Sequence, residues 1–579
     1  RRVMSGSRVS FTFEGKNLVD LDVFSKSDPF VVAYLRFEDG DRPTPWREIG
    51  RTETIWNSRN PKFQKSIETA YEFSHAQALK FEVYDRDVAR SEDLSRHSFI
   101  GKTEVTLARI LTAKGQQILA ELQFDRKRVP RGKEKRGFLI VRAEETLTAK
   151  EFLKMNVSVE QLRVGKLLRP QCSLTISARD EDRWQEVTSA GPCKVAGRNN
   201  LVGFKNVTVR LQQLRHFSES TPVRIDVYKG FKKNGRKLLG SANLSWEELK
   251  HMADGRTLEL QAGTSSAGLL TFGSCRVERE STFLDYIAGG HQVELAVAVD
   301  FTASNGNPSF PSSLHHCADP MKPNDYVRAI RAVGKILTAY DSDNLIPAFG
   351  FGAKMPPSFS APTHCFNLSG NPNKSECVGV QGVLQSYFLA LNNVKLSGPT
   401  VFSDVIKKVA ASAREGAEEN TYTILLIITD GAISSSDWQS TVHEIVRASR
   451  LPMSIVIVGV GDADFSAMDR LDADDEPLVS NGQKMAADIV QFVPFRKYER
   501  NAGLLAAEVL EEIPGQFLDY MRRNRVQPKR IPLRDDSISL VSERSAGEDK
   551  PWFSNSRSPS VGSAYRHVEK GGLPDVPAG

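Results

Sequence analysis

Short stretches of alternating hydrophobic and polar residues predict antiparallel β-strands in the first half of the chain. In residues 1–126 the alternation is visible in VSFTF, FVVAYL and LKFEVY, with turn-rich segments between them. After a charged linker, DRKRVPRGKEKRG, the same pattern starts again at FLIVRAEE and continues through CSLTISARD, NVTVRL and VRIDVY. The pattern therefore predicts two all-β antiparallel sandwiches in tandem, over residues 1–126 and 136–262.

The pattern changes over residues 285–520. The runs ELAVAVD, TILLIITDG and MSIVIVGVGDAD are almost continuously apolar, as expected of strands buried on both faces. Segments with helical periodicity lie between them, which predicts an α/β domain with an open parallel sheet covered by helices on both faces. Residues 530–579 are rich in Ser, Arg, Pro and Gly, and we expect a disordered tail there.

The composition of the chain indicates a cellular location and a region of concentrated positive charge. None of the apolar runs in the 579 residues approaches the 18–20 residues that are needed to span a bilayer. The six cysteines are sparse and lack metal-ligand spacing, which favours a cytosolic protein with reduced thiols. The net charge is +6, but residues 151–262 alone hold 19 Lys and Arg against 12 Asp and Glu. The positive charge is therefore concentrated in the second predicted sandwich.

Four aspartates in the first sandwich lie in two loops, LVDLDVFSKSDPF and VYDRDVAR. If both loops lie at one end of the sandwich, Asp22, Asp28, Asp85 and Asp87 would repel one another, and Ca²⁺ suits them because it accepts six to eight oxygen ligands. An alternative is that they only form turns. "SKSDPF" and "VYDRD" resemble the C2 domain, a calcium-dependent phospholipid-binding sandwich. The resemblance implies that the four aspartates bind Ca²⁺ and that Phe24 inserts into the membrane interface. Ser98 occupies the position of a usual fifth aspartate, for which Asp93 could substitute.

The corresponding loops of the second sandwich are basic. In VYKGFKKNGRKLLG, the positions of Asp85, Asp87 and the usual fifth aspartate are occupied by Lys229, Phe231 and Lys237. In QLRVGKLLRPQCSL, we align Lys166 with Asp22 and Cys172 with Asp28. These residues cannot form a calcium site, so we expect a calcium-independent surface for anionic membranes. Its expected members are Lys166, Leu167, Leu168, Arg169, Lys229, Lys232, Lys233, Arg236 and Lys237. The alternatives are a solvated basic loop and, less favoured for lack of interleaved aromatic residues, nucleic-acid binding.

Hydroxyl and carboxyl groups follow the apolar strands of the α/β domain. Asp300, Thr302 and Ser304 follow one strand, Asp430 ends another, and Thr400 lies on a loop between them in the sequence. The carboxyl ends of parallel strands meet at one edge, and such an oxygen site suits Mg²⁺ or Mn²⁺. The five residues resemble the metal-ion-dependent adhesion site of von Willebrand A domains, with Thr302 in place of its first serine; this implies that an acidic side chain of a protein partner completes the metal shell. Helix capping is the alternative role.

The order of the three domains and the segments FLDYIAGG, VDFTASNG, YDSDNLIPAFGFGA and FSAMDRLDAD resemble the copine family. The resemblance implies a cytoplasmic adaptor that moves to the plasma membrane when calcium rises, binds phospholipid and recruits partners through its third domain. We expect no enzymatic activity, since no phosphate-binding loop or catalytic triad is apparent, and we expect His315 and His316 to be an exposed loop pair. A constitutive membrane scaffold and a metal-dependent kinase or phosphatase acting through Asp300 are the alternative functions.

Overall fold

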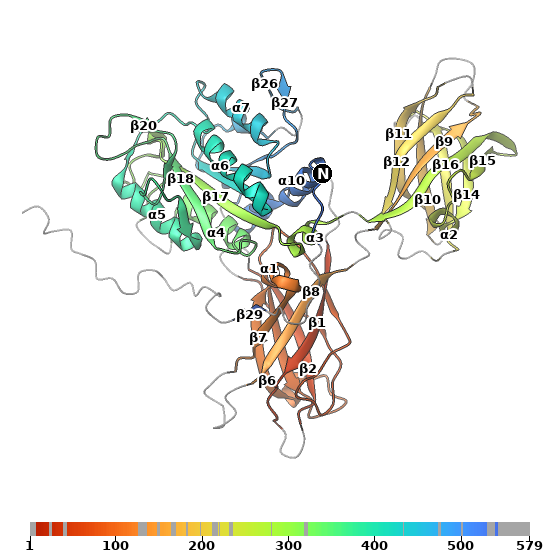
Figure 1. The fold of residues 1–579 in the computed structure, drawn as a ribbon, viewed down its shortest axis with the longest axis horizontal. Helices are drawn as coiled ribbons and strands as arrows, with labels where there is room; N and C mark the ends of the chain where they lie inside the picture. Colours follow the sequence, from red (N-terminus) through yellow and green to blue (C-terminus); the bar gives the residue numbers. More distant parts are fainter. Residues whose placement is uncertain are drawn as a thin grey trace, which may run out of the picture.

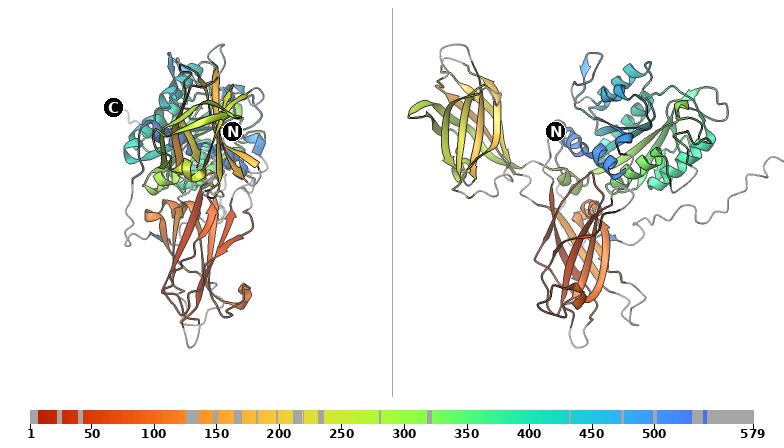
Figure 2. Two further views of the ribbon diagram at one scale, coloured as in Figure 1. Left: turned by 90° about the vertical axis from the view of Figure 1, so that its right-hand side faces the viewer. Right: turned by 180° about the vertical axis from the view of Figure 1, so that it is seen from behind.

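The computed structural model contains two β-sandwiches and an α/β domain (Figure 1). It describes residues 7–21, 26–38, 43–124, 136–146, 151–163, 170–180, 183–196, 199–210, 218, 220–230, 236–279, 281–317, 322–431, 433–472, 476–498, 502–529 and 539–541. The strands of the second sandwich lie apart from the other two domains (Figures 1 and 2).

The first sandwich consists of two sheets. The described strands are β1 (Arg8–Lys16), β2 (Pro29–Phe37), β3 (Arg47–Arg51), β4 (Ile67–Ala70), β5 (Gln77–Asp85), β6 (Ser98–Thr106), β7 (Gln117–Glu121) and β8 (Phe138–Glu145), with helix α1 (Leu107–Thr112). One sheet has the order β3-β2-β5-β6, and the other contains β7-β8-β1-β4. Alternate side chains such as Val9, Phe11 and Phe13 of β1 are buried, which is the periodicity that the sequence showed.

The second sandwich repeats this strand order. Its strands are β9 (Glu151–Glu160), β10 (Gln171–Asp180), β11 (Arg183–Lys194), β12 (Val202–Arg210), β13 (Pro222–Lys229), β14 (Lys237–Ser245), β15 (Thr257–Ala262) and β16 (Ser265–Arg279), with helix α2 (Trp246–Lys250). The path β11-β10-β13-β14 corresponds to β3-β2-β5-β6, and β15-β16-β9-β12 corresponds to β7-β8-β1-β4. A whole sandwich is therefore repeated along the chain.

The expected boundary between the sandwiches was wrong by one strand. FLIVRAEE forms β8, which pairs with β1 and β7 of the first sandwich rather than opening the second. The second sandwich continues beyond residue 262, because β16 pairs along its length with β9. Alternation identifies an amphipathic strand but does not say which sheet it joins, and the charged linker before FLIVRAEE suggested a domain boundary inside the first sandwich.

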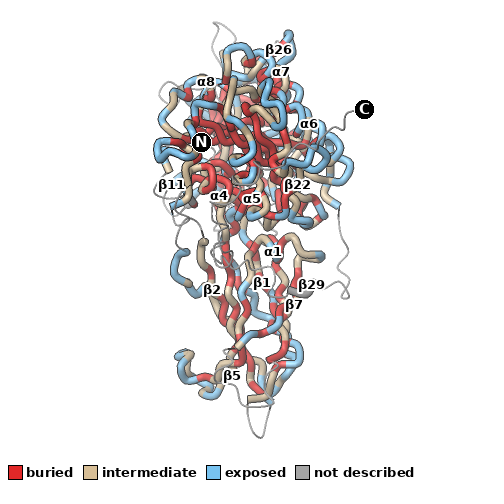
Figure 3. Tube along the Cα trace, turned by 90° about the vertical axis from the view of Figure 1, so that its left-hand side faces the viewer, coloured by how far each residue is buried: buried red, intermediate tan, exposed pale blue. Residues whose placement is uncertain are grey.

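The α/β domain has an open, mostly parallel sheet of order β21-β18-β17-β24-β25-β28. Its strands are β17 (Gln292–Asp300), β18 (Leu345–Phe351), β21 (Phe366–Asn367), β22 (Glu376–Val378), β24 (Thr421–Thr429), β25 (Met453–Gly459) and β28 (Val490–Pro494). Smaller pieces are β19 (Ala353–Lys354), β20 (Pro362–Thr363) and β23 (Lys395–Leu396), which form one small sheet, and the hairpin of β26 (Val479–Ser480) and β27 (Gln483–Lys484). The sheet is buried in Figure 3, as the continuous apolar runs predicted.

Helices cover both faces of this sheet (Figure 1). They are α3 (Phe283–Ala288), α4 (Asp325–Leu337), α5 (Gly379–Asn393), α6 (Ser403–Gly416), α7 (Trp438–Ala448), α8 (Ser466–Asp469), α9 (Ala502–Leu510) and α10 (Ile513–Arg523). Val297 and Val299 of β17 share a core with Ile330 of α4. Ala296 and Ala298, on the other face of β17, share a second core with residues of α6 and α7. The two cores account for the doubly covered sheet.

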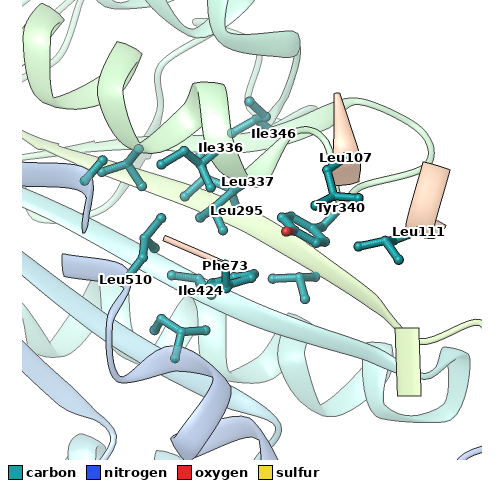
Figure 4. Close-up of a cluster of buried hydrophobic side chains, with 14 of the residues drawn as sticks. Phe73, Leu107, Leu111, Leu295, Ile336, Leu337, Tyr340, Ile346, Ile424 and Leu510 are labelled. Carbon is teal, nitrogen blue, oxygen red and sulfur yellow. The ribbon is translucent and has the colours of Figure 1, made fainter. Parts of the chain in front are cut away.

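The core of the first sandwich continues into the α/β domain. Phe73, Leu107 and Leu111 of the sandwich lie in one apolar cluster with Tyr340 and Leu295 of the α/β domain (Figure 4). The core of the second sandwich is a separate cluster. Two of the three domains are thus packed together through apolar side chains, whereas the described core residues of the second sandwich form a cluster of their own.

Part of the expected disordered tail is ordered. Residues Ser539–Val541 form β29, which pairs in parallel with β7 at the edge of the first sandwich. The rest of residues 530–579 lies outside the described part of the chain.

Candidate functional site

Two of the predicted calcium ligands meet at one end of the first sandwich. Asp28 directly precedes β2 and Asp85 ends β5, and these strands are neighbours. The backbone N–H of Asp28 donates to Asp85 Oδ1 at 2.5 Å, and the N–H of Arg86 donates to the carbonyl of Asp28 at 3.0 Å. Asp28 Oδ1 also accepts from the N–H of Asn57 at 2.6 Å. Asp28 and Asp85 are therefore held next to each other through the backbone of Asp28, and Asp85 is only 1% exposed.

The other predicted ligands are placed differently. Asp87 is exposed, and Asp22 and Phe24 lie outside the described residues. Asp93 caps a short helical turn, where its carboxylate accepts from the hydroxyl and the N–H of Ser95 at 2.8 and 3.0 Å; these hydrogen bonds lower the pKa of Asp93. Ser98 lies opposite Asp85 in the β5–β6 register. A role for Asp93 as a ligand remains a prediction.

Arg86, which the sequence reasoning passed over, organises the loop between Asp85 and Ser98. Its guanidinium donates to Thr54 Oγ1 at 2.6 Å and to the carbonyl of Ser91 at 2.9 Å, and lies 4.6 Å from the centre of the Phe30 ring. The only signal for this role was the position of Arg86 between two aspartates in VYDRD.

The described part of the basic surface lies where β13 and β14 meet. Lys229 and Lys237 are opposite each other in the register, and Lys237 is exposed. Arg236 instead lies back along the sandwich: it donates to Thr175 Oγ1 at 3.2 Å and its guanidinium lies 4.2 Å from the centre of the Tyr228 ring. The remaining expected members, Lys166, Leu167, Leu168, Arg169, Lys232 and Lys233, are outside the described residues.

The alignment of Cys172 with Asp28 was wrong by one position. Cys172 faces Lys229 in the register as Pro29 faces Asp85, so the equivalent of Asp28 is Gln171. The backbone agrees, since the N–H of Gly230 donates to the carbonyl of Gln171 as that of Arg86 donates to Asp28. A glutamine carries no charge, so this position still adds no carboxylate.

In the α/β domain, four of the five predicted metal ligands form one hydrogen-bonded group at the carboxyl edge of the sheet. Thr302 donates to Asp300 Oδ1 through its N–H at 2.8 Å and its hydroxyl at 2.6 Å. Ser304 Oγ lies 2.9 Å from Thr302 Oγ1 and donates to Asp430 Oδ1 at 3.0 Å. β17 and β24 are adjacent parallel strands, which is why their terminal aspartates meet.

Thr400 lies on a neighbouring loop. Thr302 forms a parallel bridge with Ser397, and the N–H of Ala303 donates to the carbonyl of Ser397. The carbonyl of Thr400 accepts from the N–H of Ser434 at 3.0 Å, and its side chain is half-buried. Gly352, with φ of 79°, allows the end of β18 to approach, because a β-carbon there would collide with Thr302 Cγ2. The Thr400 loop is therefore tied to the loop that carries Thr302.

The electrostatics of the group fit a cation. Asp300 is fully buried, and both burial and the nearby Asp430 carboxylate raise its pKa above the ordinary range. Burial also raises the pKa of Asp430. A divalent cation would compensate two such carboxylates, and the surrounding hydroxyl oxygens are ligands that Mg²⁺ and Mn²⁺ accept. The residues thus have the chemistry of a metal site.

Buried side chains support the loop from below. Tyr326 donates to Asn305 Oδ1 at 2.6 Å, and Asn305 donates in turn to the carbonyl of Thr302 at 3.3 Å. The expectation that His315 is exposed was wrong: it is 1% exposed, stacks on Tyr326 at 4.5 Å and lies 2.8 Å from the hydroxyl of Tyr387. Burial lowers the pKa of His315 to about 3, so it is neutral at physiological pH.

Comparison with known proteins identifies the domains and the family. The C2 domain model matches residues 10–122 and the Copine model matches residues 313–529. Protein BONZAI 1 of Arabidopsis thaliana is 37% identical, with 90% of this chain and 91% of the relative covered; Copine-A of Dictyostelium discoideum is 35% identical, with 90% and 85% covered. Among solved structures, the calcium-bound pair of C2 domains of Extended-Synaptotagmin 2 matches 48% of this chain and 99% of that chain at 16% identity and a TM-score of 0.20.

The N-terminal sandwich is a C2 domain. The chain as a whole belongs to the copine family, because the similarity to Copine-A and Protein BONZAI 1 extends over nine-tenths of its length. None of the helices within the described ranges has the length and apolar character needed to cross a membrane.

Proposed function

We propose that this copine is a calcium-dependent phospholipid-binding adaptor, with Asp22, Asp28, Asp85 and Asp87 as calcium ligands and Asp93 as a further one. The observation that carries the proposal is the meeting of Asp28 and Asp85 at one end of a C2 domain. Carboxylates gathered at one end of a sandwich repel one another, and Ca²⁺ with open coordination sites binds the phosphate of an anionic lipid. Phe24 adds an apolar contact with the membrane interface.

The second sandwich has a supporting role in this proposal. It is a second C2-type domain without calcium ligands, and its basic surface binds anionic lipid at any calcium concentration. Lys229 and Lys237 are two described members of this surface, each adding about 1 kcal/mol near an anionic membrane. Lys166, Leu167, Leu168, Arg169, Lys232, Lys233 and Arg236 complete the proposed surface. Two weak membrane signals then combine into stable attachment when calcium rises.

The α/β domain recruits protein partners in this proposal. It is an A-type domain in which Asp300, Thr302, Ser304, Thr400 and Asp430 hold Mg²⁺ or Mn²⁺. The bound metal would supply a Lewis-acidic position for a carboxylate of the partner. The role is one of binding rather than catalysis, in keeping with the names of the two relatives, neither of which is an enzyme name. The protein would move from the cytoplasm to the plasma membrane as calcium rises.

Sedimentation with phosphatidylserine vesicles tests the calcium switch. Wild-type protein should pellet with vesicles in calcium far more than in chelator, and Asp85→Asn/Asp87→Asn should abolish the difference. Glu104→Gln/Glu121→Gln, which neutralises two exposed carboxylates elsewhere in the same domain, is the matched control and should behave as wild type. Equal pelleting in chelator would favour the constitutive scaffold instead, attached through the basic surface.

A further inference from the structure

A hollow of about 730 Å³ lies beside α6, outside the group formed by Asp300 and Asp430. We call it the α6 hollow; Met355, His364, Cys365, Phe366, Lys407 and Lys408 are among its lining residues. Phe366 is buried, and Met355 and Cys365 are partly buried, so one wall of the hollow is apolar. A hollow of this size accommodates several side chains of a ligand.

The opposite wall, on α6, carries positive charge. Lys407 and Lys408 are exposed, and neither lies within 4.0 Å of a carboxylate that the structure describes. Lys354 and Lys395 face each other on the small sheet next to the hollow, and neither lies within 4.0 Å of a described carboxylate; Lys395 is exposed and Lys354 is half-buried. Among the described residues of the lining, Asp404 is the one that is acidic. The balance of charge favours an anionic ligand.

The charges lie close to the apolar wall. Burial raises the pKa of the Cys365 thiol to about 11; the Asp404 carboxylate adds to this rise and the Lys408 ammonium opposes it. Lys408 and Cys365 line the same hollow, so a single ligand can contact both walls.

Short chain segments connect the α6 hollow with the loops of the proposed metal site. β23, which pairs with β19 beside the hollow, leads directly into Ser397, and Ser397 bridges to Thr302. α6 begins at Ser403, three residues after Thr400. At 1.5 Å per residue, Lys407 lies about 6 Å along the helix axis from Ser403. An extended chain advances ~3.3 Å per residue, so about two residues of an extended segment cover the interval between Ser403 and Lys407.

We propose that the α6 hollow is the second half of the partner-binding groove, and that its occupant is an extended acidic segment of a protein. One carboxylate of the segment binds the metal held at Asp300, an apolar side chain contacts Phe366, and a second carboxylate pairs with Lys407 and Lys408. This inference rests on the proposed role of the metal site. A recessed apolar wall favours a peptide over a bilayer, which contacts projecting groups.

A peptide selection on the full-length protein tests the groove. Random 12-residue peptides displayed on phage would be selected in Mg²⁺ and again in Mn²⁺, and enriched sequences synthesised with a fluorophore for anisotropy titrations. We expect enrichment of peptides with two acidic residues that flank an apolar one. Lys407→Glu should weaken their binding at least tenfold.

Arg414→Glu is the matched control, because Arg414 is an exposed cation on the same helix, two turns further along. It should change the affinity less than twofold, and thermal unfolding of both variants should match that of the wild type. Asp300→Ala and EDTA should each abolish binding.

The outcomes separate the two proposals. Peptides that lose binding in Asp300→Ala but bind Lys407→Glu normally would overturn the α6 hollow and leave metal-dependent recruitment standing. Peptides that bind Asp300→Ala normally would overturn the role of the metal site itself. If no acidic peptides are found among the selected sequences, the inference is overturned. It is also overturned if Lys407→Glu weakens attachment to phosphatidylserine vesicles while its affinity for the peptides stays unchanged.

Discussion

The hydroxyl groups of Tyr71 and Tyr340 lie 2.7 Å apart, although the two residues are 269 positions apart in the chain. Tyr71 belongs to the C2 domain and Tyr340 to the α/β domain, and both are buried. The Phe73 ring packs beside them, with its centroid 4.9 Å from those of Phe283 and Tyr340. A polar pair inside an apolar core holds a specific orientation, because each hydroxyl has the other as its partner.

This contact couples the two domains. Thr112 Oγ1 donates to the carbonyl of Ala339 at 3.4 Å, and Lys335 Nζ lies 3.4 Å from Glu38 Oε2, both across the same interface. The end of the C2 domain where β2 begins and β5 ends, which carries Asp28 and Asp85, is opposite the end that carries α1, and α1 faces the α/β domain (Figure 1). Membrane attachment of the C2 domain would therefore place the α/β domain at a defined distance from the bilayer.

The first prediction concerns this buried pair. Tyr71→Phe or Tyr340→Phe removes one hydroxyl and leaves the other buried without its partner, which should lower the free energy of unfolding by about 1–3 kcal/mol. The double variant removes both, so it should be less destabilised than the sum of the single variants. Urea unfolding of all four proteins measures this double-mutant cycle, and strictly additive effects would contradict the pairing.

The second prediction concerns pH. Burial raises the pKa of Glu294, at the start of β17, to about 7, and Asp341 and Asp343 add to the rise. Because the folded-state pKa is above the ordinary value of 4.5, the contribution of Glu294 to stability is present below pH 4.5 and is lost as the pH rises through 7. The free energy of unfolding should therefore fall over this interval.

Glu294→Gln removes this titration. Compared with the wild type, the variant should be more stable at pH 8, by on the order of 1–3 kcal/mol, and should lose that advantage at pH 4.5. Urea denaturation at the two pH values measures the difference. Glu415→Gln, at an exposed position on α6, is the control and should show no such change; an equal effect of Glu294→Gln at both pH values would rule out titration as the cause.

The strands and their types could be predicted from the sequence because burial on one face or on two faces leaves different patterns. The proximity of Asp300 and Asp430 could be predicted as well, since each ends an apolar run and adjacent parallel strands end at one edge of the sheet. The assignment of the strand FLIVRAEE to the first sandwich could not be predicted, because its alternation of apolar and polar residues fits either sandwich. The burial of His315 depends on Tyr326 and Tyr387, and the contact of Tyr71 with Tyr340 depends on domain packing. Neither has a local signal in the sequence.

The third prediction concerns the residues beneath the loop of the proposed metal site. Tyr326→Phe removes the hydrogen bond to Asn305, which holds the carbonyl of Thr302. Such supporting bonds orient the ligands, and their loss should reduce Mn²⁺ affinity by about 10–100-fold. Isothermal titration with Mn²⁺ measures the affinity. Tyr422→Phe, which loses a bond to Ser454 near the other end of β24, is the matched control; equal Mn²⁺ affinity in both variants would show that Asn305 is held in place without Tyr326.

The fourth prediction concerns the tail strand. β29 pairs with β7, whose other neighbour is β8, so it covers an edge that would otherwise leave N–H and C=O groups open to other chains. A chain that ends at residue 529 should therefore show faster hydrogen exchange at those amides of β7 that point toward β29. A chain that ends at residue 545 keeps β29 and should retain the slow exchange.

A single substitution separates pairing from other effects of truncation. Leu540→Pro in the full chain removes the N–H in the middle of β29 and should accelerate exchange in β7 much as the shorter chain does. Leu540→Val keeps the backbone donor and should leave exchange unchanged. If the wild type, the two shorter chains and the two Leu540 variants all have equal exchange rates in β7, Ser539–Val541 does not cover this edge in solution. The edge would then be open to an extended segment of another protein.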